Sequence, residues 1–240
     1  MPPPNPLNLR RAAERGQTRL DWLQSEHSFS FANYHDPQHR GFRSLRVINQ
    51  DRVAPGGGFP THPHRNMEIF SYVIDGVLAH QDSLGHRREL APGQIQLMSA
   101  GSGILHSEFN PSSTQSLHFL QIWIKPQTLD LPPAYTEWQP RPEHADQAKV
   151  LVISPDGRDQ SATIRQDANI YRLRLQTRQS VTHLLAPDRG AWLQLISGTL
   201  MVGGTRLGPG DAVSTENAGN LLIEAEQPSE ALLFDLGERS

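Results

Sequence analysis

The stretch Gly56-Gly-Gly-Phe-Pro-Thr-His62-Pro-His64-Arg-Asn-Met-Glu68 places two histidines one residue apart, directly after a glycine-rich turn. Later in the chain, His106-Ser-Glu108 repeats that spacing with a histidine and a glutamate. Side chains two residues apart on a β-strand point to the same face. The two segments therefore predict two strands of one barrel, each turning a pair of side chains inward, so that a single ion could bridge them.

These four side chains would form the donor set of a catalytic metal ion. Three neutral imidazoles and one carboxylate suit a divalent first-row ion and leave coordination positions open, unlike a closed structural site. A His-X-His pair by itself is more often surface polarity or a chance pair, but the second pair at strand spacing favours a site. The spacing leaves the carboxylate open, because Glu68 would share a face with His64 on an uninterrupted strand and Glu108 shares one with His106.

Short β-type runs separated by glycine and proline make up most of the remaining chain. Glycine and proline occur 19 times each, and sustained helical periodicity is scarce. The runs include residues 44–48, 69–74, 117–124, 149–154, 169–175, 192–196, 199–202 and 221–224. Many short strands with frequent turns predict an all-β sandwich or barrel.

Two phrases recur in the same order in the two halves of the chain. Tyr72-Val-Ile-Asp-Gly76 precedes Leu90-Ala-Pro-Gly-Gln94, and Leu195-Ile-Ser-Gly198 precedes Leu207-Gly-Pro-Gly-Asp211. Two unrelated hairpins could share this turn chemistry, but the common order and spacing favour a duplicated barrel. Prolines also cluster between residues 125 and 148. We therefore expect a proline-rich tail at 1–9, a metal-binding domain at 10–130, a linker at 131–148 and a second domain at 149–240.

Charge and hydropathy argue against several classes of partner. With 22 basic and 25 acidic residues and a net charge of -3, the chain has no broad field for nucleic acid or an anionic membrane. No apolar run reaches the roughly 18 to 20 residues of a membrane-spanning helix, and the N-terminus does not read as a secretory signal. We expect a cytoplasmic protein and a monomer. Because cysteine is absent, any metal must use nitrogen and oxygen ligands.

The histidine-rich region resembles the cupin motifs. Gly56, His62, His64, Glu68 and Gly76 follow the first motif, and the segment from Gly93 through His106 to Asn110 follows the second, with Ser99 in place of proline and two residues inserted before the histidine. Together with residues 22–33 and 41–48, the region resembles the pirin family, especially its bacterial quercetin 2,3-dioxygenase-like members. The resemblance is strong over about residues 10–126, and the second half resembles the family's C-terminal cupin only in outline.

The resemblance implies a bicupin, with two tandem antiparallel β-barrels of jelly-roll type and few short helices. It implies metal ligands at His62, His64, His106 and Glu108, so Glu68 becomes a candidate to orient a ligand imidazole. We expect one divalent ion, Fe(II) first, with Zn, Mn, Ni or Cu as alternatives. The implied reaction is ring cleavage of a flavonol such as quercetin by dioxygen with release of carbon monoxide, in which Glu108 accepts the proton of the 3-hydroxyl.

Other functions remain open from the sequence. Pirin-like proteins are also associated with regulation, in which the metal barrel would bind a protein partner instead of catalysing a reaction. A cupin sugar isomerase would need a basic cluster near the site, for which only Arg65, Arg87 and Arg88 are available. A flat polyphenol could be clamped by large side chains near the motifs, which otherwise form ordinary barrel core: Phe59, Phe70, Met98, Phe119 and Trp123.

The second half is expected to lack a metal site. Aligning the repeated glycine turns places Leu184, Ala186 and Ile223 at the positions of the three site histidines. His183 is one place out of register, so we expect it to be an outward-facing, solvated histidine. Six other histidines are expected to be surface or structural residues: His27, His35 and His39 before the barrel motif, and His80, His86 and His144 in or near predicted turns. His118 falls in an alternating run and could face either the cavity or the solvent.

Overall fold

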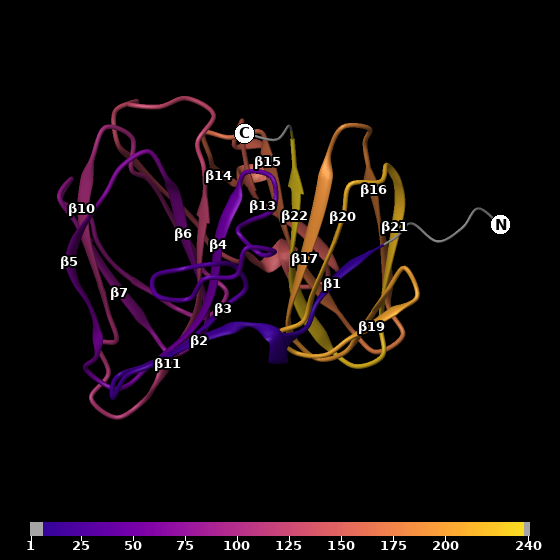
Figure 1. Cartoon of the computed structure of the whole chain (residues 1–240), viewed down its shortest axis with the longest axis horizontal. Helices are drawn as coiled ribbons and strands as arrows, with labels where there is room; N and C mark the ends of the chain where they lie inside the picture. The colour runs from indigo at the N-terminus through magenta and orange to yellow at the C-terminus, as the bar shows by residue number, and fades with distance from the viewer. Residues whose placement is uncertain (1–6, 238–240) are drawn as a thin grey trace. The chain divides into compact units, whose positions relative to one another are not determined.

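The computed structural model describes residues 7–237, which form two compact units (Figure 1). The N-terminal unit comprises residues 16–140 and 162–166. The described part of the C-terminal unit comprises residues 7–15, 141–161 and 167–237. Residues 1–6, which belong to the expected proline-rich tail, lie outside the described residues.

Helical structure within residues 7–237 is confined to three single turns of 3₁₀ helix. These are η1 (Ala12–Glu14), η2 (Pro142–His144) and η3 (Arg158–Gln160). No helix in this range is long and apolar enough to cross a membrane. The expectation of an all-β chain with few short helices is confirmed.

Two antiparallel sheets build the N-terminal unit. The larger has the order β12-β9-β6-β11-β4-β3-β2, and the smaller has the order β5-β10-β7-β8. Their bounds are β2 (Gly16–Arg19), β3 (Leu23–His27), β4 (Leu45–Val53), β5 (Gly58–His64), β6 (Glu68–Asp75), β7 (Leu78–Asp82), β8 (Arg87–Leu90), β9 (Ile95–Ser99), β10 (Ile104–Phe109), β11 (Leu117–Ile124) and β12 (Ala134–Trp138). The pair of sheets is a jelly-roll of the cupin type.

Apolar side chains from both sheets pack into one core at one end of this unit. The cluster contains Leu23, Val53, Val73, Leu78, Leu90, Leu117 and Phe119, all buried. Strand β5 carries Pro60 and Pro63 and lies at the edge of the smaller sheet, where a missing backbone N–H is tolerated. A register shift between β5 and β10 separates the pair His62–His106 from the pair Phe59–Glu108. This irregular edge positions the candidate site.

The C-terminal unit has the same construction. One sheet contains strands in the order β1-β20-β17-β22-β15-β13, and the other has the order β16-β21-β18-β19. The bounds are β1 (Asn8–Arg10), β13 (Lys149–Ser154), β15 (Ala168–Leu175), β16 (Ser180–Leu185), β17 (Gly190–Ser197), β18 (Leu200–Val202), β19 (Thr205–Leu207), β20 (Ala212–Thr215), β21 (Gly219–Ala225) and β22 (Ser229–Leu236). Its interior is aliphatic, with Leu173, Leu193, Leu195, Ile223 and Leu233 among the fully buried members.

The internal repeat is confirmed by the strand order and by the turns. The order β9-β6-β11-β4 in the first unit corresponds to β20-β17-β22-β15 in the second, and β5-β10-β7-β8 corresponds to β16-β21-β18-β19. The matched glycines adopt nearly the same left-handed backbone, with φ of 81° at Gly76 and 84° at Gly198. In both units a Cβ at this glycine would lie within 2.7 Å of a backbone carbonyl oxygen, so both turns require glycine.

The limits of the two units lie elsewhere than the domain limits expected from the sequence. Strand β1 pairs with β20, so residues 8–15 belong with the C-terminal unit instead of forming a tail and the start of the first domain. Strand β12, inside the expected linker 131–148, pairs with β9. The prolines on both sides of β12 made this segment read as a linker. They are compatible with a strand here because β12 lies at the edge of its sheet and needs backbone N–H donors on only one side.

Candidate metal centre

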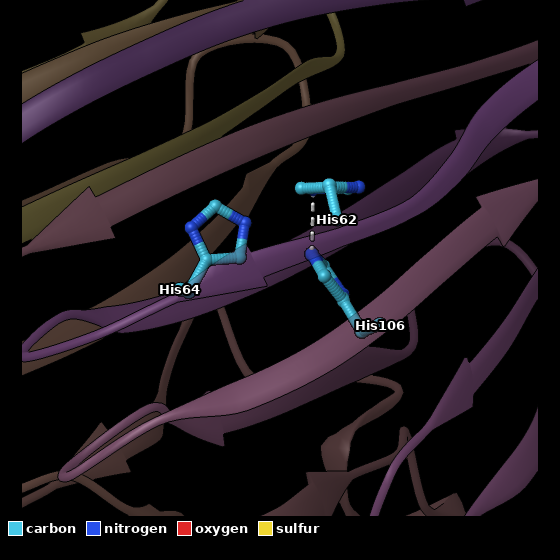
Figure 2. Close-up of side chains that lie close together, drawn as sticks. All are labelled: His62, His64 and His106. Atoms are coloured by element: carbon cyan, nitrogen blue, oxygen red, sulfur yellow. Dashed lines mark hydrogen bonds between the residues drawn. The ribbon is translucent and has the colours of Figure 1, made fainter.

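Three histidines meet between two neighbouring strands of the N-terminal unit (Figure 2). His62 and His64 project from β5, and His106 projects from β10, where it pairs with His62. The Nε2 atoms of His62 and His106 lie 3.0 Å apart, and one ring nitrogen of each of the three histidines lies within 4.8 Å of the others. The alternation read from the sequence thus brings these three side chains together.

The ring nitrogens are prepared to act as ligands. His62 Nδ1 donates a hydrogen bond of 2.7 Å to the carbonyl oxygen of Pro60, so that Nε2 is the ring nitrogen that faces His106. Burial, reinforced by the neighbouring imidazoles, lowers the pKa of His106 to about 3 and that of His64 to about 4. Both rings are therefore neutral near pH 7, which is the form that binds a metal ion.

The donor set fits a divalent transition-metal ion. Bonds of about 2.1 Å from metal to nitrogen hold adjacent ligand atoms about 3 Å apart, which matches the separation of the two Nε2 atoms. Burying a cluster of imidazoles without a metal ion to bind them would cost desolvation free energy that no interaction offsets.

Glu108 lies beside the three histidines, and its orientation is fixed by hydrogen bonds. Ser71 Oγ and Gln96 Nε2 donate to one carboxylate oxygen over 2.8 and 2.9 Å, and Gln121 Nε2 donates to the other. The carboxylate falls outside the set formed by all three histidines. It belongs instead to an overlapping set with His80 and His106.

His80 is a site residue that sequence reasoning placed wrongly. It lies in the middle of β7, not in a turn, is 3% exposed and pairs directly with Glu108 across β7 and β10. Its Nε2 atom lies 3.2 Å from a carboxylate oxygen of Asp82, so the ring is oriented by that residue. The alternation of Leu78, His80 and Asp82 after the Gly76 turn was the signal that could have identified it.

Glu68 is not part of either histidine cluster, although the sequence spacing allowed it. It is 1% exposed and accepts hydrogen bonds from Ser99 Oγ at 2.7 Å and from the backbone N–H of Arg165 at 3.2 Å. Burial raises the pKa of Glu68, and the two hydrogen bonds oppose that rise. Its contacts tie residues 162–166 to β6, which is a structural role.

Replacing Glu68 with alanine should lower stability without removing metal. Two buried donors would lose their acceptor, so we expect the free energy of unfolding to fall by about 2 to 3 kcal/mol. Denaturant unfolding and metal analysis of the same preparation measure both quantities. Ser99→Ala, which deletes one of the two donors, should cost about half as much. A metal-free Glu68→Ala protein that is still folded would contradict this assignment.

A cavity of about 210 Å³ adjoins the histidines. Its lining residues come mainly from β3, β4, β5, β10 and β11: Thr18, Leu23, Ser25, His27, Phe31, Ala32, Asn49, Asp51, Phe59, His62, His64, Glu108, Gln121 and Trp123. Trp123 stands at right angles to His64, with ring centroids 4.8 Å apart, and Phe31 packs on its edge at 5.5 Å. The cavity therefore combines the candidate ligands with an aromatic wall.

Two of the five side chains expected to clamp a substrate line this cavity. Phe59 and Trp123 line the cavity, whereas Phe70, Met98 and Phe119 do not. Phe119 shares the inward face of β11 with Trp123 but lies deeper, in the apolar core cluster, and Met98 packs with Ile69. Phe70 alternates with Ser71, whose hydroxyl reaches Glu108, so Phe70 faces the other side of the sheet.

The C-terminal unit holds apolar residues at most of the equivalent positions. Its ladders pair Ile223 with Val202 and Leu221 with His183, in the places where the first unit pairs Glu108 with His80 and His106 with His62. His183 therefore occupies the position of His62 and Leu221 that of His106, so the expected register was wrong by one residue on β16 and by two residues on β21. Within the described residues of this unit, no set of three or more acidic or histidine side chains is arranged to hold a metal.

His183 is buried, contrary to the expectation of a solvated loop residue. It is 2% exposed, while the neighbouring Leu184 is 70% exposed, because strand alternation turns the histidine inward. Its Nε2 donates to Asp235 at 3.0 Å, and its Nδ1 accepts a hydrogen bond of 3.0 Å from Lys149. Arg189 also binds Asp235. A charged network replaces the metal centre in the interior of this unit.

His183→Ala should destabilise the C-terminal unit and leave the metal content unchanged. The variant would leave Asp235 and Lys149 buried with one partner fewer, so we expect a loss of about 2 to 3 kcal/mol in unfolding free energy. Thermal and denaturant unfolding with metal analysis provide the check, and Leu184→Ala on the outward face is the matched control. A loss of bound metal in folded His183→Ala would show that this half contributes to the centre.

Two jelly-roll units, of which one gathers three histidines beside a cavity, define a two-domain cupin with one candidate metal centre. A family model named Pirin matches residues 8–124, and a model named Quercetinase C-terminal cupin domain matches residues 151–236. The chain belongs to the pirin family.

Relatives match over nearly the whole chain. The sequence is 45% identical over 230 residues to a protein named quercetin 2,3-dioxygenase from Escherichia coli strain K12, covering 96% of this chain and 98% of that protein. A pirin-like protein of Caulobacter vibrioides is 37% identical over 218 residues, covering 89% and 92%.

Solved structures agree with the sequence comparison. The crystal structure of YhhW from Escherichia coli superposes with a TM-score of 0.94 and 44% identity, over 97% of this chain and 98% of that one. A structure of bacterial pirin YhhW in complex with nickel(II) superposes with a TM-score of 0.92 at 44% identity, over 97% and 99%.

Proposed function

We propose that this protein is a metal-dependent dioxygenase that cleaves the ring of a flavonol such as quercetin and releases carbon monoxide. The observation that carries the proposal is the convergence of three imidazoles beside an aromatic cavity. The relative named quercetin 2,3-dioxygenase, 45% identical over 96% of this chain, supports the same reaction.

In this proposal His62, His64 and His106 hold one divalent ion, with Glu108 as the carboxylate of the site. Bound there, a divalent ion supplies Lewis acidity that favours the ionised form of a chelating hydroxyl. The nickel(II) complex of the related bacterial pirin supports a transition-metal ion. Iron(II) remains our proposal for the native ion, because its open coordination positions suit oxygen chemistry.

Glu108 accepts the proton of the substrate hydroxyl in this scheme. Ser71, Gln96 and Gln121 hold the carboxylate against rotation, so it presents a fixed base to a hydroxyl bound at the histidines. Phe59 and Trp123 contact the flat face of the substrate and exclude water from it. The reacting hydroxyl and the base are then neighbours without further motion.

The test is turnover after reconstitution with single metals. Metal-free protein is loaded under anaerobic conditions with Fe(II), Mn, Ni, Cu or Zn, and quercetin and dioxygen are then added. We expect at least one metal to give loss of flavonol absorbance with an equal amount of carbon monoxide, and metal-free protein to give neither. Tight metal binding without turnover for every ion would instead favour a regulatory, protein-binding role.

A further inference from the structure

One acidic side chain in the cavity has no part in the scheme above. Asp51 lies on β4, is 2% exposed and lines the cavity together with His62, His64 and Glu108. Its Oδ1 atom is buried and has no hydrogen-bond partner among residues 7–237. A buried carboxylate oxygen without a partner costs free energy, so its retention at a cavity wall indicates a ligand.

The neighbours of Asp51 satisfy one another. Across β3 and β4, Ser25 pairs with Asp51 and His27 pairs with Asn49. His27 Nδ1 lies 2.7 Å from Asn49 Oδ1, and its Nε2 lies 2.8 Å from Thr18 Oγ1, so both ring nitrogens are engaged. Ser25 hydrogen-bonds to the Asp51 carboxyl. Among these polar groups, the Oδ1 atom of Asp51 is the one that can still accept a hydrogen bond from a molecule in the cavity.

Asp51 does not act as a ligand of the ion. It belongs to neither of the two sets of side chains that could hold a metal. The ion's ligands and Asp51 therefore mark two separate points on the wall of one cavity. The same cavity is also lined by three aromatic side chains, Phe31, Phe59 and Trp123. A ligand that satisfies the whole surface is a flat aromatic molecule with polar groups at two places.

We propose that Asp51 is a specificity-determining residue that binds a hydroxyl group of the substrate other than the pair that would chelate the metal. This inference rests on the proposed flavonol chemistry and extends it to the rest of the substrate. A cationic partner is disfavoured, because a loaded metal centre in the same small cavity would repel it. Burial raises the pKa of Asp51 to about 7, opposed by the hydrogen bond from Ser25, so the group can accept or donate a hydrogen bond to a phenol.

The test compares two flavonols that differ in their additional hydroxyls. Quercetin carries several, whereas 3-hydroxyflavone carries only the chelating one. Metal-loaded wild type, Asp51→Leu and Asp51→Asn are titrated anaerobically with each. We expect Asp51→Leu to weaken quercetin binding about tenfold and 3-hydroxyflavone binding by less than about twofold, with Asp51→Asn between them. Asp75→Asn, at an exposed position on β6, is the matched control.

Each outcome decides the matter. Equal losses on both flavonols, or no loss on quercetin, would overturn the role of Asp51. If Asp51→Leu does not fold, as judged by circular dichroism and metal content, the isosteric Asp51→Asn decides by the same comparison, with about a threefold loss expected on quercetin alone. Wild type that binds quercetin without turning it over would refute the proposed enzyme but still test Asp51. Wild type that binds neither flavonol would overturn both.

Discussion

His106→Ala will remove the bound metal and, with it, flavonol turnover. His106 is 2% exposed and lies 3.0 Å from His62 through the facing Nε2 atoms, so its loss leaves two imidazoles from one strand. Losing a residue that merely orients a ligand lowers metal affinity 10- to 100-fold. Losing a ligand itself should therefore cost at least about 100-fold. Metal analysis after dialysis, with a competition titration against a chelator, measures the effect.

The control for this variant is His35→Ala, which removes an exposed histidine away from the centre. It should retain both metal and activity. His62→Ala should behave like His106→Ala, because the two residues pair across β5 and β10. Circular dichroism and thermal unfolding establish that the variants are folded. Full metal content in dialysed His106→Ala and His62→Ala would place the ligands elsewhere and end the proposal.

Glu108→Gln should reduce turnover by about 10²- to 10⁴-fold, the range expected when a positioned general base is lost. The amide is similar in size, but it cannot accept a proton from the substrate hydroxyl. It also presents an NH₂ group to the donors Ser71, Gln96 and Gln121. Steady-state kinetics on quercetin, carbon monoxide release and metal content are measured on one preparation.

The metal content of Glu108→Gln separates two roles of the carboxylate. Retained metal with lost turnover identifies a base, and loss of both identifies a ligand. Glu89→Gln, an exposed glutamate on β8, is the matched control and should leave both quantities unchanged. Turnover of Glu108→Gln at the wild-type rate would exclude either role.

The face of each motif residue was readable from the chain alone. Period-two alternation at residues 62 and 64 turned both histidines to one side of β5, and the lack of cysteine limited ligands to nitrogen and oxygen. The repeated glycine turns likewise required left-handed backbone wherever they occurred, so the duplication could be predicted. These are local properties, which depend on bond geometry and on neighbours in the sequence.

Pairing between strands decided everything else about the site. Alternation placed Glu68 and Glu108 on equally suitable faces, and only the ladders put Glu108 opposite His80 while Glu68 reached Ser99 and Arg165. The inward position of His183 also depended on the strand register. The loops between strands set that register, and aligning the repeated turns in the sequence misplaced His183 by one residue. Periodicity specifies to which side of a strand a side chain points. Which residues it contacts, and how deeply it is buried, depend on how strands distant in the sequence pack together, and the order of residues does not give that packing directly.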